Sequence, residues 1–375
     1  MKKGDESHIF LYALLIVVVL IGIGFLIKNV YVSPGQIPAR VPVAVPAVQL
    51  PSSDPPFKIV AENLIIPWDI EFLPNDDMVV TERPGNLLRI GTDTKKIPIE
   101  GVDIKGEGGL LGLALHPKFE QNHFMYVYLT ATNENRVERY TFDLDKNTVH
   151  NRKVILGGIP TSSFHDGGRI KFGPDGYLYI TTGDTTNAAY AQDTKSLAGK
   201  ILRVTDEGEI PTDNPFGTEV YSYGHRNPQG IAWDSDGNLW ETEHGPSGPI
   251  ETGQDELNII QKGKNYGWDI IFGDKSKTGM ESPLLQSGSA ETWAPAGTAY
   301  YKGNIFFTGL RGETLYQYAI KEKTLQKHYI HTFGRLRPVT VHKGFLYFAS
   351  SNQDGRGNHY QNEDKIIRVK LDALV

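Results

Sequence analysis

The chain of 375 residues contains no cysteine, so disulfides, thiolate metal sites and cysteine nucleophiles are excluded. It also lacks an excess of positive charge. There are 38 Lys and Arg residues against 44 Asp and Glu, a net charge of −6, and this balance does not indicate nucleic-acid binding. Long amphipathic helical periodicity is scarce after Phe57. Because there is no cysteine, any bound metal must use oxygen or imidazole ligands. Because helical periodicity is scarce, the folded part should consist mainly of strands.

The amino terminus differs from the rest of the chain. The run from Ile9 to Ile27 is apolar and uncharged, and at about 1.5 Å per residue a helix of this length crosses roughly 30 Å of hydrocarbon. We expect a membrane helix within residues 1–30, with a cleaved signal peptide as the alternative. Residues 31–56 are rich in proline with small apolar partners. This pattern favours extended polyproline geometry and predicts a stalk, whose valines could instead pack on the folded part.

Short β-rich runs recur from Phe57 to the carboxyl end. Each has a short strand, a polar turn that is often closed by glycine, and an apolar strand, which is the pattern of a hairpin. The runs lie at 70–90, 113–130, 170–184, 231–241, 298–320 and 339–350. Six units over roughly 320 residues give about 50 residues each, the scale of a four-stranded propeller blade.

We therefore predict that residues 57–375 form an all-β domain, a six-bladed β-propeller. The ring should close where the segment IIRVKLD near the carboxyl end pairs with strands that begin near FKIVAENL. A long β-sandwich is the alternative fold. Because a propeller gathers loops on one face, residues that are far apart in the sequence can meet there.

One segment combines donors for an anion with oxygens for a cation. The string YGHRNPQGIAW, followed by ETEHGP, contains Arg226 beside Asn227 and the step from Gly245 to Pro246. The arginine and the asparagine offer convergent donors, and the Gly-Pro step offers bare backbone carbonyls. The segment predicts a site for an anionic ligand held together with a hard cation. The alternative is a turn and a strand with a satisfied arginine.

A histidine and a carboxylate flank one predicted hairpin. His165 lies in the loop SSFHDGG just before a strand, and Asp184 ends the hairpin that follows. The hairpin could bring both to the same end of a blade, where the carboxylate would fix the tautomer of the imidazole and raise its basicity. The alternative is an ordinary surface histidine, because the chain has 11 of them.

Further arginines stand at strand ends. Arg311 follows one predicted strand, and Arg335 and Arg337 directly precede another. Arginines two apart in an extended chain point the same way, and their forked donors suit a polycarboxylate or a phosphate. Solvated loop charge is the alternative.

A glycine-rich stretch and an acidic stretch are candidates for binding sites, the first for a nicotinamide cofactor and the second for calcium. The string GEGGLLG at Gly106 to Gly112 lacks the spacing GxGxxG and a βαβ setting, so a nicotinamide cofactor is not indicated. In GQDELNIIQKGKNYGW, by contrast, Asp255, Glu256 and the turn around Tyr266 could supply carboxylate and carbonyl oxygens to calcium. An acidic loop that caps a strand is the alternative there.

Taken together, these strings resemble the PQQ-dependent aldose sugar dehydrogenases, the glucose and sorbosone dehydrogenase family. The resemblance runs in order over nearly all of residues 57–375 through GEGGLLGLALHP, HDGGRIKFGPDG, YGHRNPQG, EHGP, NYGW, TWAP and GRLRPV. It implies a six-bladed propeller with the quinone PQQ over the centre and Ca²⁺ beside it. It also implies a quinoprotein that oxidises aldose sugars at C1 to the lactone and passes the electrons to an external acceptor.

The resemblance also implies roles for individual residues. His165 resembles the general base that takes the proton from the anomeric hydroxyl while hydride leaves C1 for the quinone, Asp184 the carboxylate that orients it, and Arg226 the arginine near the quinone carbonyl. Positions that the resemblance implies for cofactor binding are Asn227, Arg311, Arg335, Arg337, Glu107 and Thr292. Gly245 and Pro246 resemble the carbonyl ligands of an active-site calcium, and Asp255, Glu256 and Tyr266 fall in a second, structural calcium region.

The chain departs from the soluble glucose enzymes of this family at three positions. Arg311 stands where they carry lysine, and Glu107 and His244 stand where they carry glutamine. A narrow preference for glucose is therefore not implied, and the later ligands of the second calcium are not clearly matched.

Two other functions are compatible with a propeller. A calcium-dependent hydrolase of the lactonase kind needs several side-chain ligands for its metal, and this chain has arginines instead. A non-catalytic propeller that displays a rim for protein binding would need only the anchor and the stalk. From the apolar segment and the resemblance, we expect a propeller on the outer side of a cytoplasmic membrane, or a secreted one if the segment is cleaved.

Overall fold

The computed structural model describes residues 48–49, 53–248, 252–356 and 364–375. These residues belong to one unit, Pro42–Val375, and a second unit, Met1–Val41, lies outside the described residues together with the predicted membrane helix. Within the described ranges, no helix has the length and the apolar character that a membrane span requires. The membrane helix thus stays a prediction.

The turn between β11 (Ile170–Phe172) and β12 (Leu178–Thr182) illustrates how the repeated unit folds. Gly176 has a φ of 82°, a left-handed conformation that glycine adopts without strain. Its N–H donates to the carbonyl oxygen of Gly173 at 2.9 Å, which closes the turn. The two strands then pair antiparallel, with Ile170 opposite Ile180.

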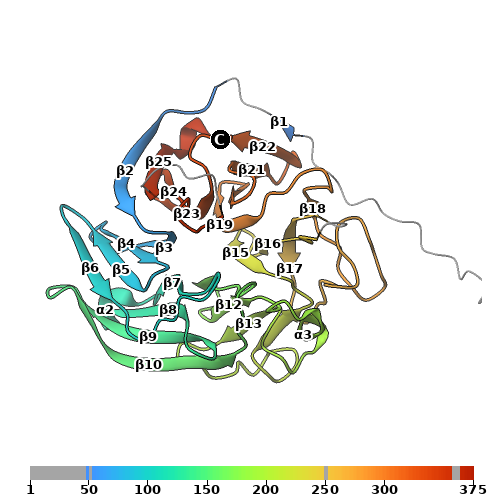
Figure 1. The fold of residues 1–375 in the computed structure, drawn as a ribbon, viewed down its shortest axis with the longest axis horizontal. Helices are drawn as coiled ribbons and strands as arrows, with labels where there is room; N and C mark the ends of the chain where they lie inside the picture. Colours follow the sequence, from blue (N-terminus) through green and yellow to red (C-terminus); the bar gives the residue numbers. More distant parts are fainter. Residues whose placement is uncertain (1–47, 50–52, 249–251, 357–363) are drawn as a thin grey trace, which may run out of the picture. The chain divides into compact units, whose positions relative to one another are not determined.

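Six sheets built mainly from such antiparallel pairs form six blades (Figure 1). Blade 1 contains β3 (Pro67–Phe72), β4 (Met78–Glu82), β5 (Asn86–Ile90) and β6 (Thr94–Pro98). Blade 2 contains β7 (Leu110–Leu115), β8 (Phe124–Thr130), β9 (Asn135–Asp143) and β10 (Thr148–Ile159). Blade 3 contains β11, β12, β13 (Lys200–Val204) and β14 (Val220–Tyr223). Blade 4 contains β15 (Pro228–Trp233), β16 (Leu239–Glu243), β17 (Glu256–Ile260) and β18 (Leu285–Gln286).

The last two blades recruit strands from the amino-terminal part of the chain. Blade 5 contains β19 (Pro295–Tyr301), β20 (Asn304–Gly309), β21 (Leu315–Ala319), β22 (Thr324–His328) and the short β1 (Val48–Gln49). Blade 6 contains β23 (Leu336–His342), β24 (Phe345–Ser350), β25 (Asp364–Lys370) and β2 (Phe57–Leu64). In β2 and β25, Phe57 faces Val369 and Lys58 faces Arg368. The predicted six-bladed propeller and its closure by IIRVKLD on FKIVAENL are thereby confirmed.

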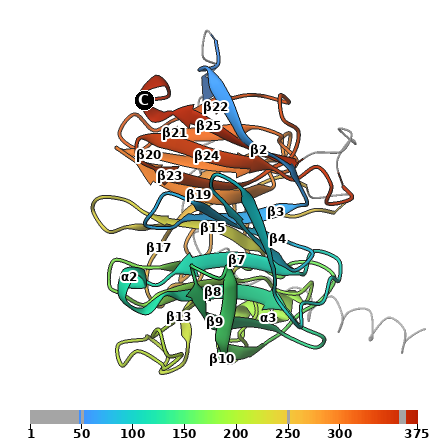
Figure 2. The same ribbon diagram turned by 90° about the vertical axis from the view of Figure 1, so that its left-hand side faces the viewer.

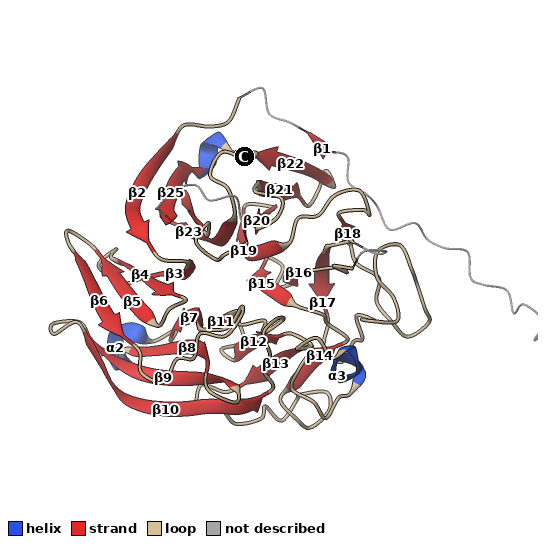
Figure 3. Cartoon of the chain, viewed as in Figure 1, coloured by secondary structure: helices blue, strands red, loops and turns tan. Residues whose placement is uncertain are grey.

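The innermost strands of the blades follow one another around the centre of the ring in the order β3, β7, β11, β15, β19 and β23 (Figure 3). Helical structure in the described part is limited to α2 (Phe119–Asn122), α3 (Ala188–Gln192) and the 3-10 helix η1 (Leu371–Ala373), as Figure 3 makes clear. Seen from the side, neighbouring blades pack face to face (Figure 2). Loops at one end of the innermost strands can therefore enclose a common site.

Buried apolar side chains fill the spaces between neighbouring blades. The group between blades 1 and 2 contains fourteen buried residues, among them Val79, Leu113 and Phe142. The group between blades 3 and 4 is the smallest of those described, with six. Buried polar side chains occupy part of that interface, among them Glu241 and Asn258. This interface is therefore more polar than its neighbours.

The end of the predicted stalk contacts the propeller. In β1, Val48 pairs with Leu325 of β22 in parallel fashion. Further along, the hydroxyl of Tyr329 donates to the carbonyl oxygen of Pro55 at 2.6 Å. These residues of the stalk region therefore pack on the outer edge of blade 5, and residues 31–47 and 50–52 lie outside the described residues.

Candidate active site

A cavity of about 330 Å³ opens among the loops where the six blades meet. Every blade, or a loop next to it, contributes to its wall. The lining residues are Trp68, Glu107, Leu111, Asp166, Gly167, Gln229, His244, Ser247, Asp255, Thr292, Ala294, Leu310, Arg311, Arg335, Arg337 and Arg356. Six of the predicted site residues therefore meet here, namely Glu107, Asp255, Thr292, Arg311, Arg335 and Arg337.

The cavity is rich in guanidinium groups. Arg335 is held by Asp354, whose Oδ2 accepts from its Nε at 2.9 Å and from its Nη2 at 2.7 Å. Arg337 donates from Nη1 to Oε1 of Gln229 at 3.0 Å, and burial lowers the pKa of Arg337 to about 9. Arg311 is exposed at the rim. An anion in this cavity would offset the cost of burying these positive charges.

Several buried donors near the cavity have no acceptor among the described residues. They are Nε of Arg83, Nδ2 of Asn227 and Nε of Arg337. A buried donor left without a partner costs about 1–3 kcal/mol. Carboxylate oxygens of a ligand would satisfy such donors, so this chemistry fits the tricarboxylic quinone that the resemblance implies.

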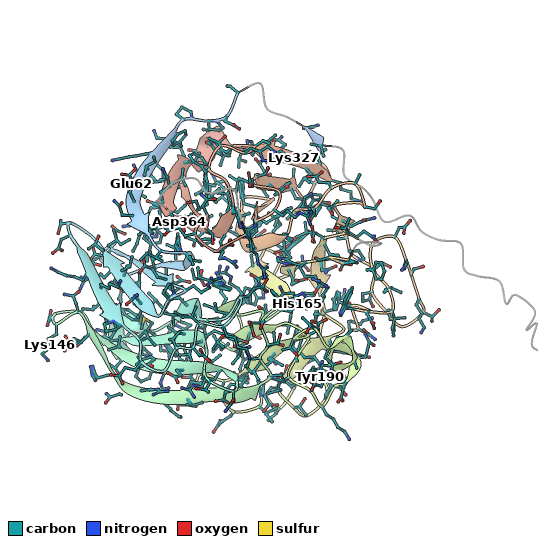
Figure 4. The ribbon with its side chains drawn as sticks, in the orientation of Figure 1. Glu62, Lys146, His165, Tyr190, Lys327 and Asp364 are labelled. Atoms are coloured by element: carbon teal, nitrogen blue, oxygen red, sulfur yellow. The ribbon has the colours of Figure 1, made fainter. Side chains whose placement is uncertain are left out.

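His165 and Asp184 form a hydrogen-bonded pair at this end of the ring. Nδ1 of His165 lies 2.6 Å from Oδ1 of Asp184, a carboxylate that is only 2 % exposed. Figure 4 shows His165 toward the middle of the ring, far from peripheral residues such as Lys146 and Lys327. Gly183 permits the close approach, because a Cβ there would lie 2.0 Å from the carbonyl oxygen of His165. With Nδ1 engaged, Nε2 of His165 is the ring nitrogen left for a substrate.

Glu107 links His165 to the cavity wall. Its Oε2 accepts the backbone N–H of His165 at 2.9 Å, and its Oε1 pairs with Arg356. Burial alone would raise the pKa of Glu107, but the charge of Arg356 and the His165 amide lower it to about 2. Glu107 is therefore a fixed anion between the histidine and the arginine-rich side.

Arg226 and Asn227 stand behind the wall rather than on it. The guanidinium of Arg226 lies 5.2 Å from the ring centre of Trp268, and burial lowers the pKa of Arg226. Oδ1 of Asn227 accepts the N–H of Gly167 at 3.1 Å, and that of Gln229 Nε2 at 3.4 Å. Asn227 thus holds the loop that carries the histidine and the side chain of Gln229 in place, and Arg226 lies against Trp268.

Asp255 fixes the step from Gly245 to Pro246 through a hydrogen bond. The N–H of Gly245 donates to Oδ1 of Asp255 at 2.9 Å. Oδ2 accepts from Thr292 Oγ1 at 2.9 Å, from the Trp293 amide at 2.6 Å and from the Ala294 amide at 2.9 Å. Asp255 and Thr292 therefore act here as parts of a clip, and Pro246 is buried next to it.

Glu256 and Tyr266 lie apart from the cavity, at the interface of blades 3 and 4. There the possible ligand atoms of His225, Glu241 and Glu243 all lie within 4.8 Å of one another. Burial raises the pKa of Glu243 to about 8, and it also raises the pKa values of Glu241 and Glu256.

Two oxygens of this group have no donor among the described residues, namely Glu241 Oε1 and Asn258 Oδ1. Buried carboxyls with free oxygens fit a hard cation, as the resemblance implies for this region. The hydroxyl of Tyr266 is already used, since it donates to the carbonyl oxygen of Ile259 at 2.7 Å. Only the backbone carbonyl of Tyr266 could serve such an ion.

Sequence reasoning assigned no role to several residues of the site. They are Trp68, Asp166, Trp268, Asp354 and Arg356. Trp268 belongs to the string NYGW, one of the strings that carried the family resemblance. That string did not indicate that Trp268 contacts Asp184. Asp166 likewise belongs to the string HDGG, directly after His165. Trp68, Asp354 and Arg356 lie in no string that carried the resemblance, and the closed ring brings them to the site.

The fold and the cavity define the class of protein: a six-bladed propeller with a histidine–aspartate pair beside an arginine-rich cavity. The family model for Glucose / Sorbosone dehydrogenase matches residues 64–367, and the chain belongs to this family. The resemblance read from the motifs is therefore confirmed.

Named relatives agree with this placement. Aldose sugar dehydrogenase YliI of Escherichia coli is 37 % identical over 247 residues, 60 % of this chain and 65 % of that protein. Quinoprotein glucose dehydrogenase B of Acinetobacter calcoaceticus is 32 % identical over 262 residues, 59 % of this chain and 54 % of that protein. The chain thus spans less than two thirds of the length of these two relatives.

Solved structures match over more of the chain. The PQQ-bound aldose sugar dehydrogenase of Streptomyces coelicolor superposes with a TM-score of 0.79 at 38 % identity, covering 84 % of this chain and 99 % of that one. The apo form of the soluble enzyme from Escherichia coli gives a TM-score of 0.74 at 28 % identity over 84 % of this chain and 99 % of that one. Both are structures to which this propeller is similar.

Proposed function

We propose that this protein is a PQQ- and calcium-dependent dehydrogenase that oxidises aldose sugars at C1 to the lactone. The observation that carries the proposal is the His165–Asp184 pair, joined at 2.6 Å, next to a cavity lined by Arg311, Arg335 and Arg337. The names of the relatives support the cofactor and the substrate class.

Arg311, Arg335 and Arg337, with Asn227 and Thr292 around them, would hold the quinone, and Glu107 would flank it as the anion that fixes the backbone of His165. The guanidinium, amide and hydroxyl donors suit the carboxylates of the quinone, and Nε of Arg337 and Nδ2 of Asn227 still lack acceptors among the described residues. Bound PQQ would supply the acceptor for the hydride that leaves C1 of the sugar. The carbonyl oxygens of Gly245 and Pro246 would hold a calcium ion as a Lewis acid beside it.

His165 would remove the proton from the C1 hydroxyl through Nε2. Asp184 holds the Nδ1 side of the ring, which leaves Nε2 as the basic nitrogen and stabilises the imidazolium that forms. The C1–H bond breaks as the C1–O bond becomes a carbonyl, so sugar and lactone differ by one hydride and one proton. Arg226, fixed against Trp268, would stabilise negative charge that develops near it.

A reconstitution experiment tests this function. The full chain, purified in detergent, is loaded with PQQ and Ca²⁺ and given a panel of aldoses with an artificial dye as electron acceptor. We expect sugar-dependent dye reduction that needs both additions. His165→Gln should bind the quinone and lose most of the turnover, roughly a hundredfold or more.

Other outcomes separate the alternatives. Lactone hydrolysis that needs Ca²⁺ but no quinone would favour a lactonase-type enzyme. Absence of both quinone binding and turnover would favour a non-catalytic propeller. The physiological electron acceptor is outside this test because the dye replaces it.

We also propose that residues 1–30 anchor the protein in the cytoplasmic membrane, with the propeller on the outer side. The support is the uncharged apolar run from Ile9 to Ile27. Membrane fractionation and protease treatment of intact cells check it. A protein found in the medium without its first residues would instead indicate signal cleavage.

A further inference from the structure

Trp268 makes a hydrogen bond that extends the histidine–aspartate pair. Its Nε1 donates to Oδ2 of Asp184 at 2.7 Å. The other oxygen, Oδ1, lies 2.6 Å from Nδ1 of His165 and accepts a hydrogen bond from the N–H of Thr186 at 2.8 Å. Both oxygens of this buried carboxylate are therefore engaged, and its plane is fixed with respect to the imidazole.

The face of the same indole supports a second functional group. The guanidinium carbon of Arg226 lies 5.2 Å from the ring centre of Trp268. Arg226 is only 6 % exposed, so its charge is largely removed from water. The π face of a tryptophan stabilises a cation in such a place. The N–H at the edge of the indole thus binds Asp184, the partner of the base His165, and the face of the indole contacts Arg226.

Trp268 is itself held at several points. Its N–H donates to the carbonyl oxygen of Gly224 at 2.9 Å, and its carbonyl oxygen accepts from Gln192 Nε2 at 2.6 Å. Gln192 in turn exchanges hydrogen bonds with Asn265, at 2.8 and 3.1 Å. Since α3 and the loop after β14 belong to blade 3, and Trp268 follows β17 of blade 4, the indole is locked across the junction of two blades.

We propose that Trp268 is a positioning residue that aligns the base His165, through Asp184, with the cation Arg226. The proposal rests on the proposed function for the roles of these two groups, but the contacts exist in the apoprotein. Without the Nε1–H donor, Oδ2 of Asp184 loses its partner in a buried place. The carboxylate then attracts the imidazolium more strongly, and His165 holds its proton to higher pH.

Two substitutions separate the two contacts. Trp268→Phe removes the N–H donor and keeps an aromatic face for Arg226. Trp268→Gln keeps an N–H donor and removes the face. Phe272→Leu is the matched control, because Phe272 packs on the indole with ring centres 5.9 Å apart and makes no hydrogen bond to Asp184.

The decisive readout is the titration of His165 in the full-length apoprotein, followed by NMR of histidine labelled with ¹³C at Cε1. His165→Gln identifies the signal by its loss. We expect Trp268→Phe to move the midpoint to higher pH, and Trp268→Gln and Phe272→Leu to leave it near the wild-type position. The other titratable or charged groups near the pair, namely Glu107, Asp166, Arg226, His244 and Arg356, are present in all these proteins. An unchanged or lowered midpoint in Trp268→Phe overturns the proposal.

Activity gives the second readout in the reconstituted protein. We expect the acid limb of the pH profile of kcat/KM to move to higher pH in Trp268→Phe, with a loss on the order of tenfold at neutral pH. A merely structural role would lower activity at every pH without moving the limb, and that result overturns the proposal. If no variant, wild type included, oxidises sugars while the NMR shift is present, the positioning role stands and the proposed dehydrogenase function fails.

Discussion

At the scale of single residues, His165 combines a strained backbone with a fixed side chain. Its φ of 62° is a left-handed conformation, which costs a residue other than glycine about 1–3 kcal/mol. The N–H to Glu107 at 2.9 Å and the ring contact to Asp184 at 2.6 Å hold both ends of the residue. The surrounding contacts thus offset the strain, and the imidazole is aimed in one direction.

Glu71 on β3 permits a prediction about pH and stability. Burial raises the pKa of Glu71 from its ordinary 4.5 to about 7, against the lowering effect of Lys171. The folded protein therefore binds a proton that the unfolded chain releases between pH 4.5 and about 7. The stabilising contribution of Glu71 is present below pH 4.5 and is lost as the pH rises toward 7. We expect Glu71→Gln to lose less thermal stability than the wild type over this interval.

The measurement compares the melting temperatures of both proteins at several pH values, with EDTA present. All other titrating groups are common to the two proteins, so the difference between their slopes reports Glu71 alone. Parallel slopes would contradict the assignment.

The contact between His165 and Asp184 could be predicted from the sequence, but the contacts of this pair with its further partners could not. His165 and Asp184 flank a single hairpin, so local pattern suffices to bring them together. The contact of Asp184 with Trp268 spans 84 positions and depends on the packing of blade 3 on blade 4. No periodicity in the sequence encodes that contact.

At the scale of elements, the loop between β16 and β17 is tied to the loop that precedes β19. The carboxylate of Asp255 connects the two loops, because it accepts four hydrogen bonds, from Gly245, Thr292, Trp293 and Ala294. Three of the donors are backbone amides, which have no other way to reach an acceptor in a buried turn. The clip thus fixes the Gly-Pro step relative to the cavity.

We expect Asp255→Asn to lower the free energy of unfolding by about 2–4 kcal/mol, because the amide nitrogen faces backbone donors and the charge is lost. Thr292→Val removes only one of the four bonds and should cost about 1 kcal/mol. Urea denaturation in the presence of EDTA measures both. Equal losses in the two variants would show that the clip is not the source of the stability.

Some elements were visible in the sequence and others were not. The six hairpins were, because apolar strands alternate with glycine-closed turns such as that at Gly176. The outer strands were harder to predict from the sequence, because β6 reads TKKIP, which is mostly exposed, and β18 has only two residues. Such strands form because a neighbouring strand offers its free edge, which is a property of the sheet and not of the segment.

At the scale of the whole molecule, the site exists only when the ring is closed. The cavity takes Trp68 from blade 1 and Arg337 from blade 6, neighbours that meet because β2 pairs with β25. The number of blades could be predicted from the count of repeats. The convergence of arginines on one cavity could be argued only through the family resemblance, because their spacing in the sequence carries no information on distance across a ring.

The proposed function requires that this ring holds an acidic quinone beside His165 and reduces it with a sugar. Rapid anaerobic mixing of the full chain, loaded with PQQ and Ca²⁺, with an aldose tests it directly through the absorbance of the quinone. We predict that the wild type converts its bound quinone to the reduced form in a single turnover, whereas His165→Gln binds the quinone and leaves it oxidised. A wild-type protein that does not bind the quinone, or a variant that reduces it at the wild-type rate, would contradict the account.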